Sequence, residues 1–293
     1  MFEGFARKRV KVAAGEVNLA VGGRGTPLLL LHGYPQTHVM WRKVAPVLAR
    51  SFTVVCPDLR GYGDSMKPAS DETHIAYSKR AMAKDQVETM AALGFPRFDA
   101  AGHDRGGRVA HRLALDHSEK IGRVAVLDIC PTHAMYMGAD KEFATAYYHW
   151  FFLIQKAPYP ERLIGADPKY YIETKLGHWG RDRGAFEPEA VAEYVRCFSD
   201  PATIHATCED YRAAATVDLI HDEADMAQKL RGPLLALWGE KGFVGRRYDV
   251  LAEWRKRALG VSGRALPCGH FLPEEAPSET AQALLEFFKG GQA

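Results

Sequence analysis

The chain has 293 residues, of which 47% are hydrophobic and 25% charged, and these values are ordinary for a soluble globular protein of one large or two small domains. Its formal net charge of +2 gives no reason to expect nucleic acid or an acidic membrane surface as a partner. The sequence has neither the run of about eighteen apolar residues that a membrane-spanning helix needs nor the apolar segment of a secretory signal near its N-terminus.

The first 130 residues predict strands that alternate with helices. Residues 9–23 alternate apolar and polar side chains as a β-hairpin does, and residues 26–33 are an apolar run that ends at a glycine. Residues 74–93 have apolar side chains at helical spacing and are followed by Gly94. The other predicted elements are a buried strand over 52–63, a strand over 98–104, a helix over 105–117 and a strand over 121–131. The last three form a βαβ unit, which implies a parallel sheet with helices on its faces.

The pattern changes after Pro131, where aromatic residues and helix formers follow without a convincing buried strand. The strand pattern returns only near the C-terminus, and the elements predicted there are a strand over 232–239, a helix near 246–258, a strand segment over 263–271 and a helix over 276–289. Both flanks are needed to complete one sheet. We therefore predict a mostly parallel eight-stranded sheet with a helical cap inserted after the sixth strand, giving a core of residues 1–130 and 230–293 and a cap of residues 131–229.

The motif GHDRGG, residues 102–107, lies between a predicted strand and a predicted helix, and its small residues permit a sharp turn. Its G-x-D-x-G spacing is that of the nucleophile elbow of α/β-hydrolases, with Asp104 in place of the usual serine. The carboxylate would stand above the carboxyl end of the sheet, near the positive N-terminal end of a helix. The structural alternative is an aspartate that only caps that helix. We predict the α/β-hydrolase fold with Asp104 as nucleophile.

Two further motifs supply partners for this nucleophile. His32 and Gly33 end a strand where hydrolases of this fold have the loop of the oxyanion hole. His270 follows the last predicted strand, the usual place of the general base, although a capping or core histidine is the alternative.

The third member of such a triad is an acid, and two positions offer one. Asp128 ends an apolar strand, where a carboxylate is costly to bury unless it is paired, and a histidine partner would remove that cost. Glu240 follows the strand at 232–239, where many such enzymes have their acid a few residues further on, at a position that here holds glycine. We predict Asp128 as the acid and keep Glu240 as the lesser candidate.

An aspartate nucleophile determines the class of reaction. It is ionised at neutral pH and can attack an sp³ carbon directly, expelling a leaving group and forming an ester. His270, oriented by Asp128, would then activate water to hydrolyse that ester. Carbon–halogen bonds and epoxides suit this scheme, and a plain carboxylester does not.

Five segments together resemble the fluoroacetate dehalogenases, a branch of the α/β-hydrolase superfamily, and the resemblance covers nearly the whole chain. They are HGYPQTHVMW from residue 32, PDLRGYGDSMKP from residue 57, HDRGGR from residue 103, HWFFLIQKAPYPE from residue 149, and GHF from residue 269. The loops shared by all such hydrolases are weakly specific, whereas HDRGGR combined with the His-Trp pair is much more specific.

Arginine after the nucleophile distinguishes the substrate class. Haloalkane dehalogenases and soluble epoxide hydrolases commonly have tryptophan there, whereas this chain has Arg105, followed one helical turn later by Arg108. Two cations beside a nucleophilic carboxylate are expected if the substrate is itself a carboxylate, because they offset the repulsion between two anions. A surface arginine pair is the alternative, and it explains the position inside the elbow poorly.

The resemblance also implies a cradle for the departing halide, made by a His-Trp pair on the first cap helix and a later tyrosine. Carried over to this chain, these residues are His149, Trp150 and Tyr211, which offer neutral N–H and O–H donors. The neighbouring Tyr147 and Tyr148 are expected only to pack the cap onto the sheet.

A second His-Trp pair, at 178–179, stands in a stretch that looks like a loop. Trp179 is expected to line the substrate entrance, as a tryptophan there does in relatives, and His178 is expected to be incidental. Tyr34 and His32 are further candidates for the lining of the pocket.

The predicted reaction is hydrolytic dehalogenation of a small 2-haloacid, without a cofactor or a metal. The five cysteines are never spaced CxxC, and no histidine spacing suggests a metal site. We expect a cytoplasmic enzyme, with no nucleic acid or membrane partner, and the resemblance implies a homodimer. An epoxide hydrolase of the same fold is the first alternative, and a non-catalytic small-molecule receptor is a distant one.

Overall fold

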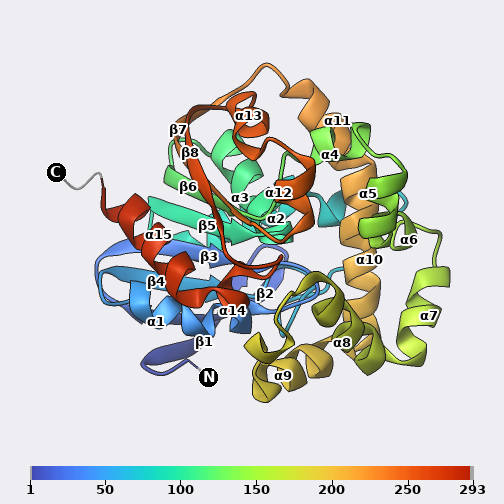
Figure 1. Ribbon diagram of the computed structural model, residues 1–293. Coiled ribbons are helices and arrows are strands. Elements are labelled where there is room, and N and C mark those ends of the chain that lie inside the picture. The colour runs from blue at the N-terminus through green and yellow to red at the C-terminus, as the bar shows by residue number, and fades with distance from the viewer. Residues whose placement is uncertain (1, 291–293) are drawn as a thin grey trace.

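The computed structural model describes residues 2–290, which form an eight-stranded sheet of order β1-β2-β4-β3-β5-β6-β7-β8 (Figure 1). This confirms the predicted fold class. The first two strands form an antiparallel hairpin, β2 pairs antiparallel with β4, and the other neighbours are parallel. The strands are β1 Phe5–Val12, β2 Gly15–Gly23, β3 Thr26–Leu31, β4 Phe52–Pro57, β5 Phe98–His103, β6 Ile121–Leu127, β7 Leu230–Gly239 and β8 Ala258–Leu266.

Helices cover both faces of the sheet, as parallel strands require. α1 and α15 pack on each other on one face, and α2 and α3 pack on each other on the opposite face (Figure 1). The inner strands are therefore apolar on both sides, and Leu28 to Leu31 of β3 are fully buried. The elements of the core outside the sheet are η1 His38–Lys43, α1 Ala45–Leu48, η2 Ile75–Tyr77, α2 Lys79–Ala92, α3 Arg105–Asp116, α12 Phe243–Arg247, α13 Val250–Arg255, α14 Leu272–Glu275 and α15 Pro277–Lys289.

A run of helices lies between β6 and β7, and most of them gather on one side of the sheet (Figure 1). None of the helices within residues 2–290 is long and apolar enough to cross a membrane. The helices of this insertion are α4 Thr132–Met137, α5 Lys141–Ala146, α6 His149–Phe152, α7 Tyr159–Ala166, α8 Pro168–Trp179, η3 Arg183–Ala185, α9 Pro188–Phe198, α10 Pro201–Ala215 and α11 Val217–Ala224.

Several predicted boundaries are wrong, for local reasons. The helix expected from residue 74 begins at Lys79, because the side chain of Ser78 accepts a hydrogen bond from Ala81 N and caps it. The helix expected over 246–258 is two short helices, since Asp249 caps the second one. The stretch at 178–179 is the end of α8 and not a loop. The pair at 149–150 begins α6, the third helix of the insertion and not the first.

The sheet brings two aspartates to the same edge. β5 and β6 are parallel neighbours with His103 opposite Leu127, so Asp104 and Asp128 each follow directly after the carboxyl end of their strand. Both residues have positive φ, 47° for Asp104 and 51° for Asp128. Such backbone is uncommon for residues with a side chain and is held at functional sites by the surrounding structure.

Candidate active site

Asp104 stands at a sharp turn between β5 and α3, with φ 47° and ψ −115°. The turn requires small residues: a Cβ on Gly102 would collide with the carbonyl oxygen of Gly106, and a Cβ on Gly106 would collide with the backbone of His32. The sequence G-x-D-x-G therefore has a steric basis here. It holds the carboxylate at the N-terminus of α3, as the elbow interpretation predicts.

The carboxylate of Asp104 is buried and held ionised. Its Oδ1 accepts a hydrogen bond of 2.9 Å from the backbone N–H of Tyr34, in the loop after β3. Burial alone would raise the pKa of Asp104, but the nearby His270, His103 and the guanidinium groups of Arg105 and Arg108 lower it below its usual value. The group is thus an anion at neutral pH, as a nucleophile must be.

His270 faces this carboxylate and is paired with an acid. Its Nδ1 lies 2.6 Å from Oδ2 of Asp128, and the other oxygen of that carboxylate accepts a hydrogen bond of 2.9 Å from Gly239 N. Glu240, the other acid considered, is exposed. A Cβ on Gly242 would lie 3.4 Å from Oδ1 of Asp128, so the loop after β7 has a glycine where the carboxylate from β6 comes close. Of these two acids, Asp128 is the one that contacts His270.

The acid limb of the pH–rate profile is expected to depend on Asp128. Burial lowers the pKa of His270, but the hydrogen bond and charge of Asp128 outweigh burial and raise it above its usual value. A general base acts when neutral, so turnover should rise as pH increases through this raised pKa. In Asp128→Asn the pKa of His270 should fall, which shifts the acid limb to lower pH. Turnover should also fall about 100-fold or more, because the base is no longer oriented.

Steady-state rates against pH for both proteins test this expectation. Halide leaves the substrate in the first step, when Asp104 attacks the α-carbon. That step needs no base, so its rate should not follow the acid limb. An unchanged limb in Asp128→Asn would show that His270 is not the titrating base.

Arg105 has a role that its position in the motif did not reveal. Its Nε and Nη2 hold the carboxylate of Asp210, on α10, at 2.9 and 2.6 Å, and Lys79 on α2 contacts the same carboxylate. The guanidinium is fully buried, and its Cζ lies 4.2 Å from the ring centre of Tyr211. Most of the hydrogen-bonding capacity of this guanidinium is therefore used inside the protein. Only Nη1 lacks a hydrogen-bond partner within the described chain.

Arg108 is a buried cation that forms no ion pair with a carboxylate in the described residues. Nη1 donates to the carbonyl of Cys130 at 3.1 Å and to the hydroxyl of Thr132 at 2.9 Å, and no carboxylate of residues 2–290 pairs with it. Burial, and then the charge of Arg105, lower its pKa. The Cζ lies 4.8 Å from the ring centre of Trp150. A buried charge of this kind is unfavourable unless an anion completes the site.

The two arginines are expected to differ when replaced by glutamine. Arg105→Gln should lower the stability by about 3–5 kcal/mol, because it breaks a buried ion pair. Arg108→Gln should lower the stability much less, since the charge that it removes has no acidic partner. Its kcat/KM for an acidic substrate should fall about 10- to 100-fold, because one charged hydrogen bond is lost. Thermal unfolding and halide-release kinetics on both variants measure this. Equal loss of stability would contradict the assignment.

The cap residues His149, Trp150 and Tyr211 meet above the elbow. The ring centres of Tyr211 and His149 are 5.5 Å apart, and those of Tyr211 and Trp150 are 6.5 Å apart. The hydroxyl of Tyr211 and Nδ1 of His149 are buried without a partner in the described residues. Burial and then the charge of Lys175 lower the pKa of His149 far below its usual value, which keeps the imidazole neutral. These groups can act as neutral donors to an anion.

The lining candidates have different environments. Trp179 lies between the two histidines, 4.4 Å from His149 and 5.7 Å from His270 by ring centres. The ring of Tyr34 stacks on His149 at 6.0 Å and donates its hydroxyl hydrogen to Tyr171 at 2.8 Å. His32 is fully buried, and its Nε2 accepts from Leu59 N at 2.9 Å, so it supports the loop from behind.

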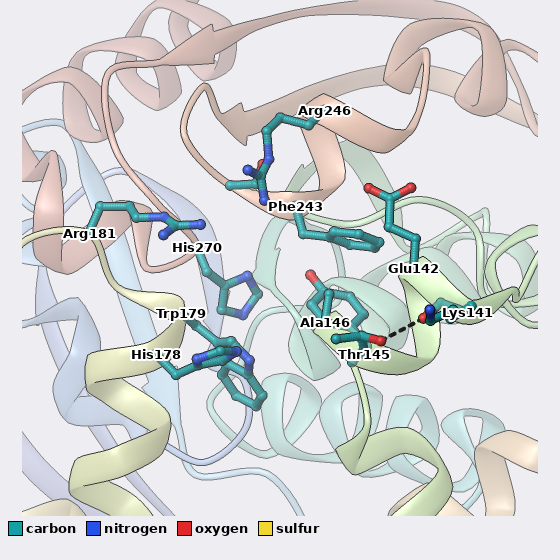
Figure 2. Close-up of a pocket in the computed structure, with 12 residues that line it drawn as sticks. Lys141, Glu142, Thr145, Ala146, His178, Trp179, Arg181, Phe243, Arg246 and His270 are labelled. Carbon is teal, nitrogen blue, oxygen red and sulfur yellow. Dashed lines mark hydrogen bonds between the residues drawn. The ribbon is translucent and has the colours of Figure 1, made fainter.

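A cavity of about 520 Å³ adjoins the site on the side of His270 and Trp179 (Figure 2). It is lined by His270 and Trp179 but not by Asp104, and we call it the vestibule. Tyr147 lines its wall, although only packing was expected of it, and Tyr148 is 44% exposed instead of packing on the sheet. His178, expected to be incidental, lines the vestibule as well. No group of three or more metal-ligating side chains occurs in residues 2–290.

Comparisons with known proteins show the fold and the family of this chain. A family model described as the alpha/beta hydrolase fold matches residues 26–277. The whole chain is 47% identical to the fluoroacetate dehalogenase of Burkholderia sp and covers 97% of it. It is 36% identical to the soluble epoxide hydrolase of Corynebacterium sp. (strain C12), over 93% of each protein. A solved alpha/beta hydrolase structure from Nostoc sp PCC 7120 is 64% identical over 99% of both chains, with a TM-score of 0.98.

Proposed function

This chain belongs to the α/β-hydrolase family, in the group of the fluoroacetate dehalogenases, and from that membership we propose that it hydrolyses the carbon–halogen bond of small 2-haloacids such as fluoroacetate and chloroacetate. The products are halide and a 2-hydroxyacid, which is glycolate for a haloacetate. The observation that carries the proposal is Arg108, a buried guanidinium beside an aspartate nucleophile with no carboxylate of its own among the described residues. A carboxylate substrate would complete that site.

In the first step the substrate carboxylate binds the free Nη1 of Arg105 and the guanidinium of Arg108. An oxygen of Asp104 attacks the α-carbon from the side opposite the halogen, and the bonding pair of the carbon–halogen bond leaves with the halide. His149, Trp150 and Tyr211 donate to the departing anion. The result is an ester between Asp104 and the former α-carbon. In-line attack predicts inversion at a chiral α-carbon.

In the second step Nε2 of His270 takes a proton from water while the oxygen of that water attacks the carboxyl carbon of Asp104. The backbone N–H of Tyr34, which already donates to this carboxylate, stabilises the developing oxyanion. The ester bond then breaks, and the hydroxyacid oxygen takes the proton from His270. The second proton of the water passes from the new carboxyl group through His270 to solvent, and Asp104 regains its carboxylate. Asp128 stabilises the imidazolium that exists between these transfers.

Halide release, followed with ion-selective electrodes, tests the proposal with fluoroacetate, chloroacetate and uncharged chloroacetamide. Both acids should release halide. The kcat/KM for the amide should be lower by about 100-fold or more, because its neutral group leaves Arg108 unpaired. Release of chloride alone would narrow the function to weaker carbon–halogen bonds. No halide from either acid, or equal turnover of the amide, would refute it.

An epoxide hydrolase is the second candidate, because the buried and unpartnered hydroxyl of Tyr211 could protonate an epoxide oxygen. The similarity to the Corynebacterium enzyme is in line with that chemistry. Turnover of a neutral epoxide that persists in Arg108→Gln would favour this candidate. Loss of acid turnover in the same variant would favour dehalogenation.

Two further properties belong to the same proposal. We propose a homodimer, which the family resemblance implies, and light scattering coupled to size exclusion tests it by mass. We also propose a cytoplasmic location, since all five cysteines are buried and free, as expected in a reducing compartment. Fractionation of the producing cell tests the location.

A further inference from the structure

The vestibule in front of His270 is lined by cations that lack acidic partners. Lys141 comes from α5, Arg181 follows α8, and Arg246 lies on α12, and all three are exposed. Figure 2 shows Arg181 and Arg246 on two sides of the pocket and Lys141 on a third, with His270 and Trp179 among them. Three separate elements thus bring positive charge to one opening.

The terminal nitrogens of these cations are available to a ligand. Nε of Arg181 donates to the carbonyl of Lys241 and Nε of Arg246 to that of Gly242, each at 3.1 Å, which anchors both guanidinium groups at the loop after β7. Neither group, nor Lys141, forms an ion pair with an acid in residues 2–290. The carboxylate of Glu275 contacts Arg181 only through its backbone N–H.

The one acid that lines the vestibule is already engaged. Glu142 lies 3.1 Å from Nη1 of Arg247, a residue outside the lining, and Arg247 also pairs with Asp140 at 2.8 Å. The chain as a whole carries a formal charge of only +2, so three unpaired cations at one opening are a local concentration and not a reflection of overall charge. A cleft lined by one sign of charge concentrates ions of the opposite sign.

We propose that this vestibule is an anion-binding subsite that collects small carboxylates and delivers them past Trp179 to the nucleophile. The substrate class rests on the proposed function, whereas binding of an anion does not. A volume of about 520 Å³ is far larger than a haloacetate needs, so the subsite holds its ligand loosely, by charge and through water. Halide and hydroxyacid products, which are also anions, pass the same cations on leaving.

The test compares two variants that each lose three cations. The vestibule variant combines Lys141→Gln, Arg181→Gln and Arg246→Gln. The control variant changes Arg97, Lys229 and Arg231 to glutamine. These three residues are exposed at the amino ends of β5 and β7, at the edge of the sheet away from Asp104. Both variants have the same net charge.

Quenching of tryptophan fluorescence by iodide detects anion binding without catalysis. The contribution of Trp179 is obtained by subtracting the signal of each protein with Trp179→Phe. In the vestibule variant the constant for quenching of Trp179 by iodide should fall about 2- to 5-fold at low salt. The constant for acrylamide, a neutral quencher, should not change. The control variant should quench as the wild type does. An equal iodide constant in all three proteins would overturn the proposal.

Kinetics of halide release give the second readout. With chloroacetate, kcat/KM of the vestibule variant should fall about 3- to 10-fold at low salt through KM, with kcat retained, and the difference should vanish above about 0.5 M salt. A loss that salt does not remove would contradict capture by charge. If the wild type releases no halide, the proposed function fails, and iodide quenching still decides on the vestibule. Arg246→Gln alone replaces the triple variant if the triple variant misfolds.

Discussion

Replacing His270 with glutamine is expected to leave a protein that releases one halide ion per active site and then stops. The first step needs the ionised Asp104, the two arginines that bind the substrate and the donors of the cap, and all of these are intact in this variant. The second step loses the base that activates water, so steady turnover should fall about 10²- to 10⁴-fold. The ester should accumulate on Asp104.

Rapid mixing with chloroacetate measures the burst, and mass spectrometry of the peptide that contains Asp104 identifies the added carboxymethyl group. His178→Gln is the matched control, since it makes the same substitution in the wall of the same cavity, away from the Asp128 carboxylate. It should turn over as the wild type does. Absence of a burst in His270→Gln would mean that the histidine also acts in the first step, and continued turnover would mean that another group activates water.

Replacing Asp104 with asparagine is expected to abolish both the burst and the turnover, with a loss of about 10⁴-fold or more. The amide is a poor nucleophile, and no ester can form. The fold should persist, because asparagine tolerates positive φ better than most residues and its Oδ1 can still accept the hydrogen bond from Tyr34.

Halide release, mass spectrometry and thermal unfolding together test this expectation. Asp116→Asn, at the far end of α3, is the control for changes in helix charge, since Asp116 pairs with Arg80 and Arg112 away from the site. Turnover by the wild-type protein in heavy-oxygen water adds a direct test of the ester. A single turnover should place the heavy oxygen in the carboxylate of Asp104 and not in the hydroxyacid. Label in the hydroxyacid after one turnover would mean that water attacks the substrate directly.

Local patterns predicted the core well. The strands could be predicted because inner parallel strands are buried on both faces and appear as apolar runs, such as 28–31. Asp128 could be chosen over Glu240 because an acid at the end of an apolar strand needs a partner. Helix boundaries could be predicted less well, because capping by Ser78 and Asp249 determines where two of the helices begin. In a sequence, several neighbouring residues can look like possible caps.

Contacts between the cap and the core could not be predicted from spacing. Asp210 is 105 positions from Arg105, and nothing in either segment indicates that the two residues pair. The same holds for Trp179, whose glycine-rich surroundings suggested a loop, although Asp167 caps the helix that carries it and its ring lies 4.4 Å from His149. Spacing describes one element at a time, whereas these neighbours depend on how distant elements pack.

The Arg105–Asp210 pair links substrate choice to folding. Asp210 also accepts hydrogen bonds from Lys79 and from the hydroxyl of Tyr62. Arg105, which we propose meets the substrate through Nη1, thus joins α10 to the core through Nε and Nη2. A lineage that shifted from acids to uncharged substrates by replacing Arg105 would first pass through a less stable intermediate protein. A change at Asp210 would have to accompany the change at Arg105. The proposed specificity for acids should therefore be hard to remove from this scaffold by single substitutions.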